Sequence, residues 1–385
     1  MHSKGCLYYI LITLLIFIAC SGGEPTYTVE EIEGVRYVHN ISPLWGDEQK
    51  IRLELVRKIG ELEGRDENYQ LYLPRDIAID KQENIYILDD GGHSVKKFDS
   101  DARFITSFGE QGQGPGELSS ASSIDIGPDG NLFIGNSGNS RIDIFDPDGN
   151  YLKSITRQDR SELSLGLIML DSGEFILNSP RTDDDFPDIS TQPIAYKYDP
   201  EGNKIAMFGE RKSYEDDFLN ITGNQFYAAS DRKNNCYITL FARNSIEKYS
   251  PEGRLLLKID RVLPFEESIS PELTYASVGR ATIGIMTFNY FSTGIHIDQK
   301  ERMWIFTYLK QSDEEFIGPD SAQGPNIRCL EVYNSDGILL TRITPDFSTD
   351  SYDLKLIHND RLYFIERENE MAVFEYRIIG ESGMD

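Results

Sequence analysis

The chain has little of the material from which metal centres and disulfide frameworks are built. Its 385 residues include four cysteines, five histidines and two tryptophans. So few cysteines exclude a small domain held together by disulfides. Basic residues are also scarce, because 38 Lys and Arg face 64 Asp and Glu and leave a formal net charge of −26. A surface of this sign repels nucleic-acid phosphates, so we expect no nucleic-acid partner.

Motifs of the common enzyme classes are missing as well. No P-loop, HExxH helix, nucleophile elbow or dinucleotide fingerprint occurs in a suitable context. Gly109, Gly112 and Gly114 have a spacing like that of a phosphate loop, but they open a connection between strands rather than a helix. The chain does contain 39% hydrophobic residues, which is enough for packed cores and excludes bulk disorder.

No apolar run is long enough to cross a bilayer. Leu7–Ala19 would span ~20 Å as a helix, which suits the hydrophobic region of a signal peptide. It leads into Phe17-Ile18-Ala19-Cys20, which resembles the lipobox of bacterial lipoproteins, where the cysteine is lipidated and becomes the new N-terminus. We therefore expect residues 1–20 to be a lipoprotein signal peptide with Cys20 lipidated, and residues 21–36 to be a flexible tether. Ordinary signal cleavage and an uncleaved anchor are the alternatives.

A repeat of 47 residues organises the remainder of the chain, as the matching positions of Asn84 and Asn131 show. Each copy consists of an apolar strand, a turn, a second and a third strand, an aromatic–Asp–x–x–Gly turn and a fourth strand. Turns such as Pro147–Gly149 and Pro251–Gly253 place glycine where a tight connection needs a positive φ. This length and pattern are typical of one four-stranded propeller blade, so we predict an all-β fold.

Six such units can be counted, and the last one lacks its fourth strand. Ile51–Gly60 is strand-like and ends in an apolar–Gly pair, like the strand that precedes the second unit. Because it precedes the first unit, we predict that it supplies the missing strand and closes a ring. The prediction is a six-bladed β-propeller over residues 37–380, with blades at approximately 74–109, 121–157, 165–209, 226–259, 292–343 and 352–378 plus 51–60.

The connections between units resemble those of a known group of propellers. Phe108–Leu118 is similar to the Gly-rich link between blades of NHL-repeat propellers, and Asn139–Asp146 is similar to their third-strand signature. With the lipobox and the closing strand, the chain resembles the six-bladed propeller lipoproteins of Bacteroidetes. The resemblance implies this fold and a lipid-anchored place in the cell envelope, and Ser21 after Cys20 favours the outer membrane, on its periplasmic or surface face. NHL propellers include protein- and RNA-binding scaffolds and metal-dependent lyases, so the resemblance leaves the function open.

Loops that join the second and third strands of the blades carry one group of candidate binding residues. Loops of the same type meet on one face of a propeller, so their Asp, His, Asn and Arg side chains can form a polar cleft for a glycan or a peptide. Turns require the same residue types, which is the alternative interpretation. The candidates are Asp89, Asp90, His93, Asn136, Arg141 and Arg243.

The innermost strands supply a second group of candidates. Aligning these strands places Asp125, His296 and Lys355 in one column around the axis, where they can hold a ligand or an ion, or be solvated at the channel mouth. NHL-type lyases place several histidines around the axis, whereas only His296 aligns there, so we predict no metal and no cofactor. The other members of the column are Ala78, Ile168 and Ala229.

The sequence also predicts the structure of an insertion, an acidic loop and two cysteines. The longest insertion, residues 260–291, contains the helix-start signal Ser270-Pro271, so we expect a helix near residues 270–280 that either covers a binding site or covers apolar surface. The acidic loop Arg181–Asp188 lacks EF-hand spacing and is expected to be solvated. Cys236 and Cys329 fall on different blades, so we expect buried thiols rather than a disulfide.

Taken as a whole, these features favour a binding module over an enzyme. We predict a monomeric, lipid-anchored protein of the cell envelope that binds a glycan, a peptide or another envelope protein. The alternative is a metal-dependent propeller lyase or a lactonase-type hydrolase with its site at the propeller axis.

Overall fold

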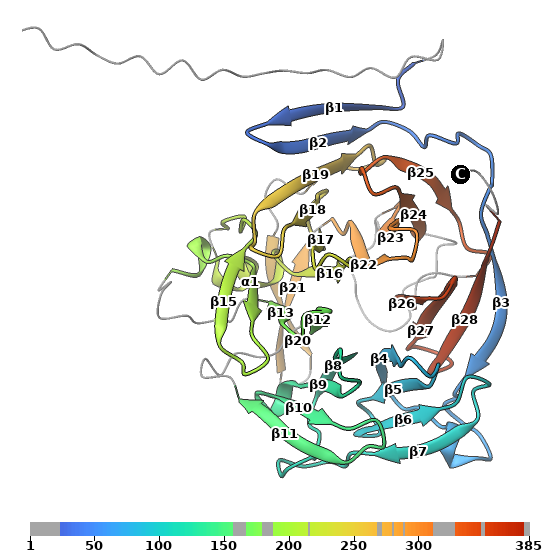
Figure 1. Ribbon diagram of the computed structural model, residues 1–385. Coiled ribbons are helices and arrows are strands. Elements are labelled where there is room, and N and C mark those ends of the chain that lie inside the picture. Colours follow the sequence, from blue (N-terminus) through green and yellow to red (C-terminus); the bar gives the residue numbers. More distant parts are fainter. Residues whose placement is uncertain are drawn as a thin grey trace, which may run out of the picture.

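Six blades, each built on four antiparallel strands, stand in a ring around a common axis (Figure 1). The structure is a computed structural model that describes residues 24–156, 167–178, 188–214, 216–267, 272–278, 281–287, 289–310, 328–347 and 351–380. Within each blade, the first of the four strands lies near the axis and the fourth lies toward the rim (Figure 1). The predicted all-β, six-bladed fold is confirmed.

The strands of the first three blades follow one another along the chain and pair antiparallel. In each blade the first strand is innermost. These blades consist of β4 (Pro74–Ile79), β5 (Ile85–Asp89), β6 (Ser94–Phe98) and β7 (Phe104–Phe108); of β8 (Ala121–Ile126), β9 (Leu132–Asn136), β10 (Arg141–Phe145) and β11 (Tyr151–Thr156); and of β12 (Ile168–Met169), β13 (Phe175–Asn178), β14 (Ala195–Tyr198) and β15 (Lys204–Phe208).

The last three blades follow the same plan, except that the sixth takes its outer strand from the N-terminal region. They consist of β16 (Phe226–Ser230), β17 (Cys236–Leu240), β18 (Ile246–Tyr249) and β19 (Leu255–Arg261); of β22 (Ser292–Ile297), β23 (Met303–Tyr308), β24 (Arg328–Tyr333) and β25 (Leu339–Ile343); and of β26 (Tyr352–His358), β27 (Arg361–Glu366), β28 (Ala372–Ile379) and β3 (Arg52–Ile59). Short helices in the connections are η1 (Glu67–Tyr69), η2 (Ser137–Asn139), η3 (Ile189–Thr191) and α1 (Asp217–Thr222). Within the described part of the chain, no helix has the length and apolar character to cross a membrane.

An aspartate after the third strand fixes the turn that follows it in several blades. Asp146 Oδ1 accepts hydrogen bonds from the backbone N–H groups of Asp148 and Asn150, at 3.0 and 2.8 Å. The turn also needs Gly149, whose φ of +88° lies in the left-handed region. Asp199 repeats this arrangement in the third blade. The recurring Asp–x–x–Gly motif is therefore the local chemistry of these tight turns.

The ring is closed by the N-terminal strand that the sequence predicts for this purpose. β3 pairs antiparallel with β28, and Ile59 lies opposite Val373. Figure 1 shows β3 along the outer side of β28. Since the two strands come from opposite ends of the chain, unfolding either end disrupts the last blade.

The prediction of a flexible tether over residues 21–36 is wrong for most of the part that the structure describes, residues 24–36. β1 (Tyr27–Ile32) and β2 (Val35–Asn40) form a hairpin, and β2 pairs in parallel with the outer strand of the fourth blade, β19. Val29 and Val38 are only 6% and 0% exposed. Their burial explains the hairpin, because the segment covers apolar surface at the rim. The fourth blade thereby extends to six strands.

The chain then runs from the fourth blade to the edge of the fifth. Asn40 Oδ1 accepts a 2.8 Å hydrogen bond from the Leu339 N–H, and the Leu44 N–H donates to the Leu339 carbonyl at 2.8 Å. The N-terminal region therefore fastens the fourth, fifth and sixth blades together along the rim.

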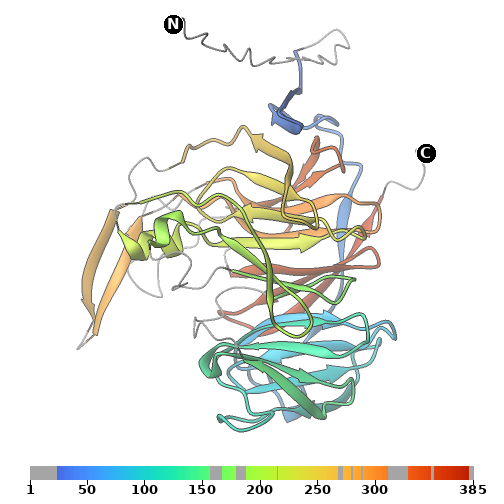
Figure 2. The same ribbon diagram turned by 60° about the vertical axis from the view of Figure 1, so that its left-hand side comes forward.

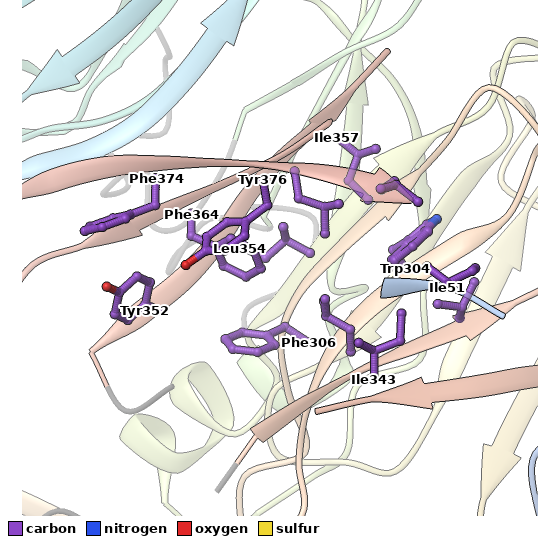
Figure 3. Packing of buried hydrophobic residues seen from close by; sticks show 14 of the residues in the cluster. Ile51, Trp304, Phe306, Ile343, Tyr352, Leu354, Ile357, Phe364, Phe374 and Tyr376 are labelled. Carbon is purple, nitrogen blue, oxygen red and sulfur yellow. The ribbon is translucent and has the colours of Figure 1, made fainter. Parts of the chain in front are cut away.

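Apolar side chains fill the spaces between neighbouring blades. Figure 3 shows the cluster between the fifth and sixth blades, which includes Trp304 and Phe306 of β23 and Phe364 of β27. All three side chains are 0% exposed, and the Phe306 and Phe364 ring centroids are 5.6 Å apart. Cys236 and Cys329 are buried free thiols in two different blades, as expected. The packed blades give the axis a rigid wall.

The prediction of a helix near residues 270–280 is wrong. β20 (Glu272–Val278) and β21 (Ala281–Thr287) occupy this region as a hairpin that pairs with no other described sheet. Figure 2 shows it reaching away from the ring. The helix-start signal is outweighed by the β-branched and aromatic residues that follow it, which favour strands. Residues 181–187 of the acidic loop lie outside the described residues, as does Cys20.

Candidate functional site

The six innermost strands surround the axis (Figure 1). Several of them carry polar residues such as Asp125, His296 and Lys355. Their pairing with the second strands defines equivalent positions in different blades. One layer lies opposite an aromatic residue of each second strand, and we call it the middle layer. It consists of Ala78, Asp125, Met169, Ala229, His296 and Leu356.

The predicted column is thus correct for Asp125 and His296 and shifted in two other blades. In the sixth blade Leu356 pairs with Tyr363, and Lys355 is the extra residue of a β-bulge. In the third blade Met169 occupies the layer in place of Ile168. Lys355 is half-buried on the same inner strand, so it still contributes a positive charge at the axis.

A second layer lies two pairing positions earlier, toward the face from which the loops between second and third strands emerge. Sequence alignment of the strands did not identify it. Two of its members are carboxylates and one is a tyrosine, which suits it for polar contacts. The layer consists of Asp76, Ser123, Tyr227 and Asp353.

Two axial carboxylates link neighbouring blades. Asp76 Oδ2 accepts a 3.0 Å hydrogen bond from the Ile124 N–H, and Asp125 Oδ2 accepts a 2.8 Å hydrogen bond from the Met169 N–H. Burial raises the pKa of Asp125 to about 7, although backbone N–H groups oppose the rise. Asp125 is therefore partly protonated near neutral pH. Burial also raises the pKa of Asp76, against the opposing charge of Lys355.

His296 is uncharged at neutral pH. Burial lowers the pKa of this imidazole to about 4, a hydrogen bond to the backbone of Leu354 opposes the change, and the charge of Lys355 adds to it. A neutral imidazole can ligate a metal ion. Among the residues that the structure describes, however, no three His, Cys, Asp or Glu side chains are grouped so as to hold one.

Two arginines converge on Asp353 at the end of the axis. Arg367 Nη2 pairs with Asp353 Oδ2, and Arg328 Nη1 lies 3.6 Å from Asp353 Oδ1. Arg328 Nη1 also donates to the Tyr352 carbonyl at 2.9 Å. The side chain of Arg328 is 7% exposed and that of Arg367 is 31% exposed. Arg367 is therefore the arginine that a ligand can reach.

Tyr227 belongs to the same electrostatic group. Burial raises the pKa of its phenol, and the charge of Asp353 raises it further, whereas Arg367 and Arg328 act in the opposite direction. The phenol is therefore a neutral O–H group that is able to donate a hydrogen bond.

We call Asp76, Tyr227, Arg328, Asp353, Lys355 and Arg367 the axial mouth. Three of these side chains are cationic, and two, Asp353 and Asp76, are carboxylates. Burial opposes the ionisation of Asp76. The chain as a whole carries a net charge of −26. Within the axial mouth, three cationic side chains therefore stand against two carboxylates, on a chain that is otherwise strongly acidic.

Three of the loop residues that the sequence predicts as binding candidates make hydrogen bonds within their own blade. Asp89 is 0% exposed, and its Oδ1 accepts a 2.7 Å hydrogen bond from the Leu73 N–H. Asn136 is also 0% exposed, and its Nδ2 donates to the Glu117 carbonyl at 2.8 Å. Arg141 Nη2 donates to the same carbonyl at 3.2 Å. These contacts fasten the loop to the connection that enters its own blade.

The other three loop candidates also make local contacts. Asp90 Oδ2 lies 3.4 Å from Arg75 Nη2, and Arg243 Nη2 donates to the Glu210 carbonyl at 2.9 Å. His93 adopts a φ of 51°, which places it in the left-handed turn conformation. A binding role for the six loop residues remains a prediction.

The fold has counterparts among solved structures. A member of the DUF4221 family from Bacteroides vulgatus is 13% identical, with a TM-score of 0.55 over 86% of this chain and 100% of that chain. A putative exported protein from Bacteroides fragilis is 11% identical, with a TM-score of 0.56 over 90% of this chain and 100% of that chain. Virginiamycin B lyase from Staphylococcus aureus is 11% identical, with a TM-score of 0.49 over 86% of this chain and 100% of that chain.

These similarities concern the fold, because the identities are low. They confirm the predicted resemblance to six-bladed propellers of Bacteroidetes at that level. No family model matches the chain, and no curated protein matches it.

Proposed function

We propose that this protein binds an anionic ligand at the axial mouth. The observation that carries the proposal is the concentration of positive charge at one end of the axis of a chain whose net charge is −26. Arg367 and Lys355 are half-buried, so bulk water screens their interaction with a bound anion less than it would at a fully exposed site. A guanidinium group binds a carboxylate through paired hydrogen bonds, and Tyr227 adds an O–H donor. A carboxylate-bearing ligand fits this set best.

The same donor set favours binding over metal-dependent catalysis. Arginine and lysine recognise anions, whereas a divalent cation needs carboxylate or imidazole ligands that converge on one point. At the axial mouth the carboxylate of Asp353 is already held by Arg367 and Arg328. These contacts support a binding module rather than a lyase or lactonase-type hydrolase.

The place of action is the bacterial cell envelope. The apolar run Leu7–Ala19 and the lipobox-like Phe17–Cys20 support export and lipidation of Cys20, with residence at the outer membrane. The similarity to a propeller described as an exported protein from Bacteroides fragilis agrees with this location.

Titration calorimetry on a soluble form that begins at Glu24 tests the proposal, with glucuronate and short acidic peptides as probes. We expect Arg367→Gln and Lys355→Gln each to weaken binding about tenfold or more, because each removes a hydrogen bond to a charged group. The matched control is Arg103→Gln, whose side chain is 73% exposed in the first blade. Equal affinities for the wild type and both axial variants would overturn the proposal. Thermal unfolding checks that the variants are folded.

A further inference from the structure

A row of aromatic rings leads from the axial mouth across the fifth and fourth blades. The Arg328 guanidinium carbon lies 4.9 Å from the Tyr308 ring centroid. The Tyr308 and Tyr290 centroids are 5.9 Å apart, and the Tyr290 and Phe241 centroids are 4.5 Å apart. We call Tyr308, Tyr290 and Phe241 the aromatic row. All three residues are half-buried, so part of each remains open to solvent.

The backbone fixes the spacing of this row. The Phe291 N–H donates to the Phe241 carbonyl at 2.8 Å, and the Tyr308 N–H donates to the Phe291 carbonyl at 3.0 Å. These bonds tie the end of β17, the start of β22 and the end of β23 side by side. The ends of β17 and β23 and the start of β22 all lie on the face of the axial mouth. The rings are therefore held in place before a ligand arrives, which lowers the entropic cost of binding.

The charge distribution restricts what can lie on the row. Its three side chains are uncharged at neutral pH, and burial raises the pKa of Tyr290 still further above neutrality. Arg328, Lys355 and Arg367 are at the axis, while the chain as a whole carries a net charge of −26. A ligand with one anionic group is attracted to the axial mouth, whereas a polyanion that extends over the row is repelled by the remaining surface.

We propose that the ligand is a glycan that carries one acidic sugar at its end. The inference rests on the proposed function, because its carboxylate is the anion held at the axial mouth by Arg367 and Lys355. The neutral sugars behind it lie along Tyr308, Tyr290 and Phe241. A sugar ring has an apolar face of C–H groups and a polar rim, and half-buried aromatic rings pack against such a face. The row offers an extended peptide apolar ring faces, whereas strand addition, one common mode of peptide binding, uses main-chain hydrogen bonds at a strand edge.

The probe is aldotriouronic acid, in which a glucuronic acid is linked to xylobiose. Titration calorimetry measures the binding of this trisaccharide, of free glucuronate and of xylobiose separately. We expect the intact trisaccharide to bind about tenfold more tightly than free glucuronate, and xylobiose to bind more weakly than either. Tyr290→Leu should lower the affinity for the trisaccharide about tenfold and leave that for glucuronate unchanged. Arg367→Gln should weaken binding of both.

Leucine at position 290 keeps an apolar side chain beside Leu219 and Ala242, and Tyr308→Leu provides a second test of the row. The matched control is Tyr72→Leu, which replaces a tyrosine that is 50% exposed outside the row. If Tyr290→Leu, Tyr308→Leu and the control all bind the trisaccharide like the wild type, the glycan inference is wrong. The proposed function still stands in that case if Arg367→Gln weakens binding of glucuronate, and fails if it does not. If no sugar probe binds while an acidic peptide does, only the glycan inference is overturned.

Discussion

The closing strand makes a sharp prediction about stability at Ile59. This side chain is 1% exposed and packs in a cluster that is shared by the last and the first blade, where Val373 and Ile77 are among its neighbours. Ile59→Ala removes buried methyl and methylene groups and leaves a cavity at the point where the ring closes. Substitutions of this type cost about 2–5 kcal/mol. We expect the free energy of unfolding to fall by that amount.

Urea-induced unfolding, followed by circular dichroism, measures the effect on the soluble form. The matched control is Ile205→Ala, which also lies on the outer strand of a blade, β15, but is 47% exposed. An exposed substitution of this kind changes stability by less than about 0.5 kcal/mol in most cases. If the two variants unfold at the same urea concentration, β3 does not close the ring as the structure shows.

Three further substitutions test the electrostatics, each by unfolding free energies. Burial raises the pKa of Asp125 from 3.8 to about 7, so ionisation costs stability as the pH rises through this range; Asp125→Asn should remove up to about 4 kcal/mol of that decline between pH 4 and 8. Partial burial lowers the pKa of His39, but two carboxylate partners raise it above 6.5. The stabilisation by the charged imidazole is therefore complete below pH 6.5 and is lost as the pH rises through the pKa of His39 in the folded protein. His39→Gln should abolish this pH dependence. Glu331→Gln should cost about 3–5 kcal/mol at neutral pH, because Glu331 and its partner Arg261, 3.1 Å away, are both 0% exposed. A pH profile that is identical to the wild type for either of the first two, or an unchanged stability for the third, would contradict the respective assignment.

Much of the fold can be predicted because the same local chemistry recurs in successive blades. The aspartate turns at Asp146 and Asp199 use the same pattern of backbone hydrogen bonds, so the sequence motif marks the ends of the third strands. The closing strand could be identified for a related reason. Once six units are counted, the last one lacks a strand, and Ile51–Gly60 is a spare strand at the other end of the chain.

Segments outside the repeat were harder to predict, since nothing in the chain repeats their pattern. The polar composition of residues 21–36 predicts a tether, yet the hairpin Tyr27–Asn40 begins within them, and Val29 and Val38 are buried against the rim. Ser270-Pro271 predicts the start of a helix, but the residues that follow favour strands and form the hairpin of β20 and β21.

The site was only partly predictable, because its members are brought together by packing. Asp125 and His296 could be placed by alignment, but the β-bulge at Lys355 leaves no signal in one sequence. Asp76 could have been found, since it lies two residues before Ala78 and therefore on the same side of the strand. Arg367 follows a second strand of the sixth blade, and only the three-dimensional arrangement shows that it reaches Asp353.

The most direct test of the account is a crystal structure of the soluble form in complex with glucuronate. We expect the carboxylate at the axial mouth, within hydrogen-bond distance of the Arg367 guanidinium and close to the Lys355 ammonium group. A carboxylate bound at the rim of the ring or at the opposite end of the axis, with Arg367 and Lys355 untouched, would contradict it.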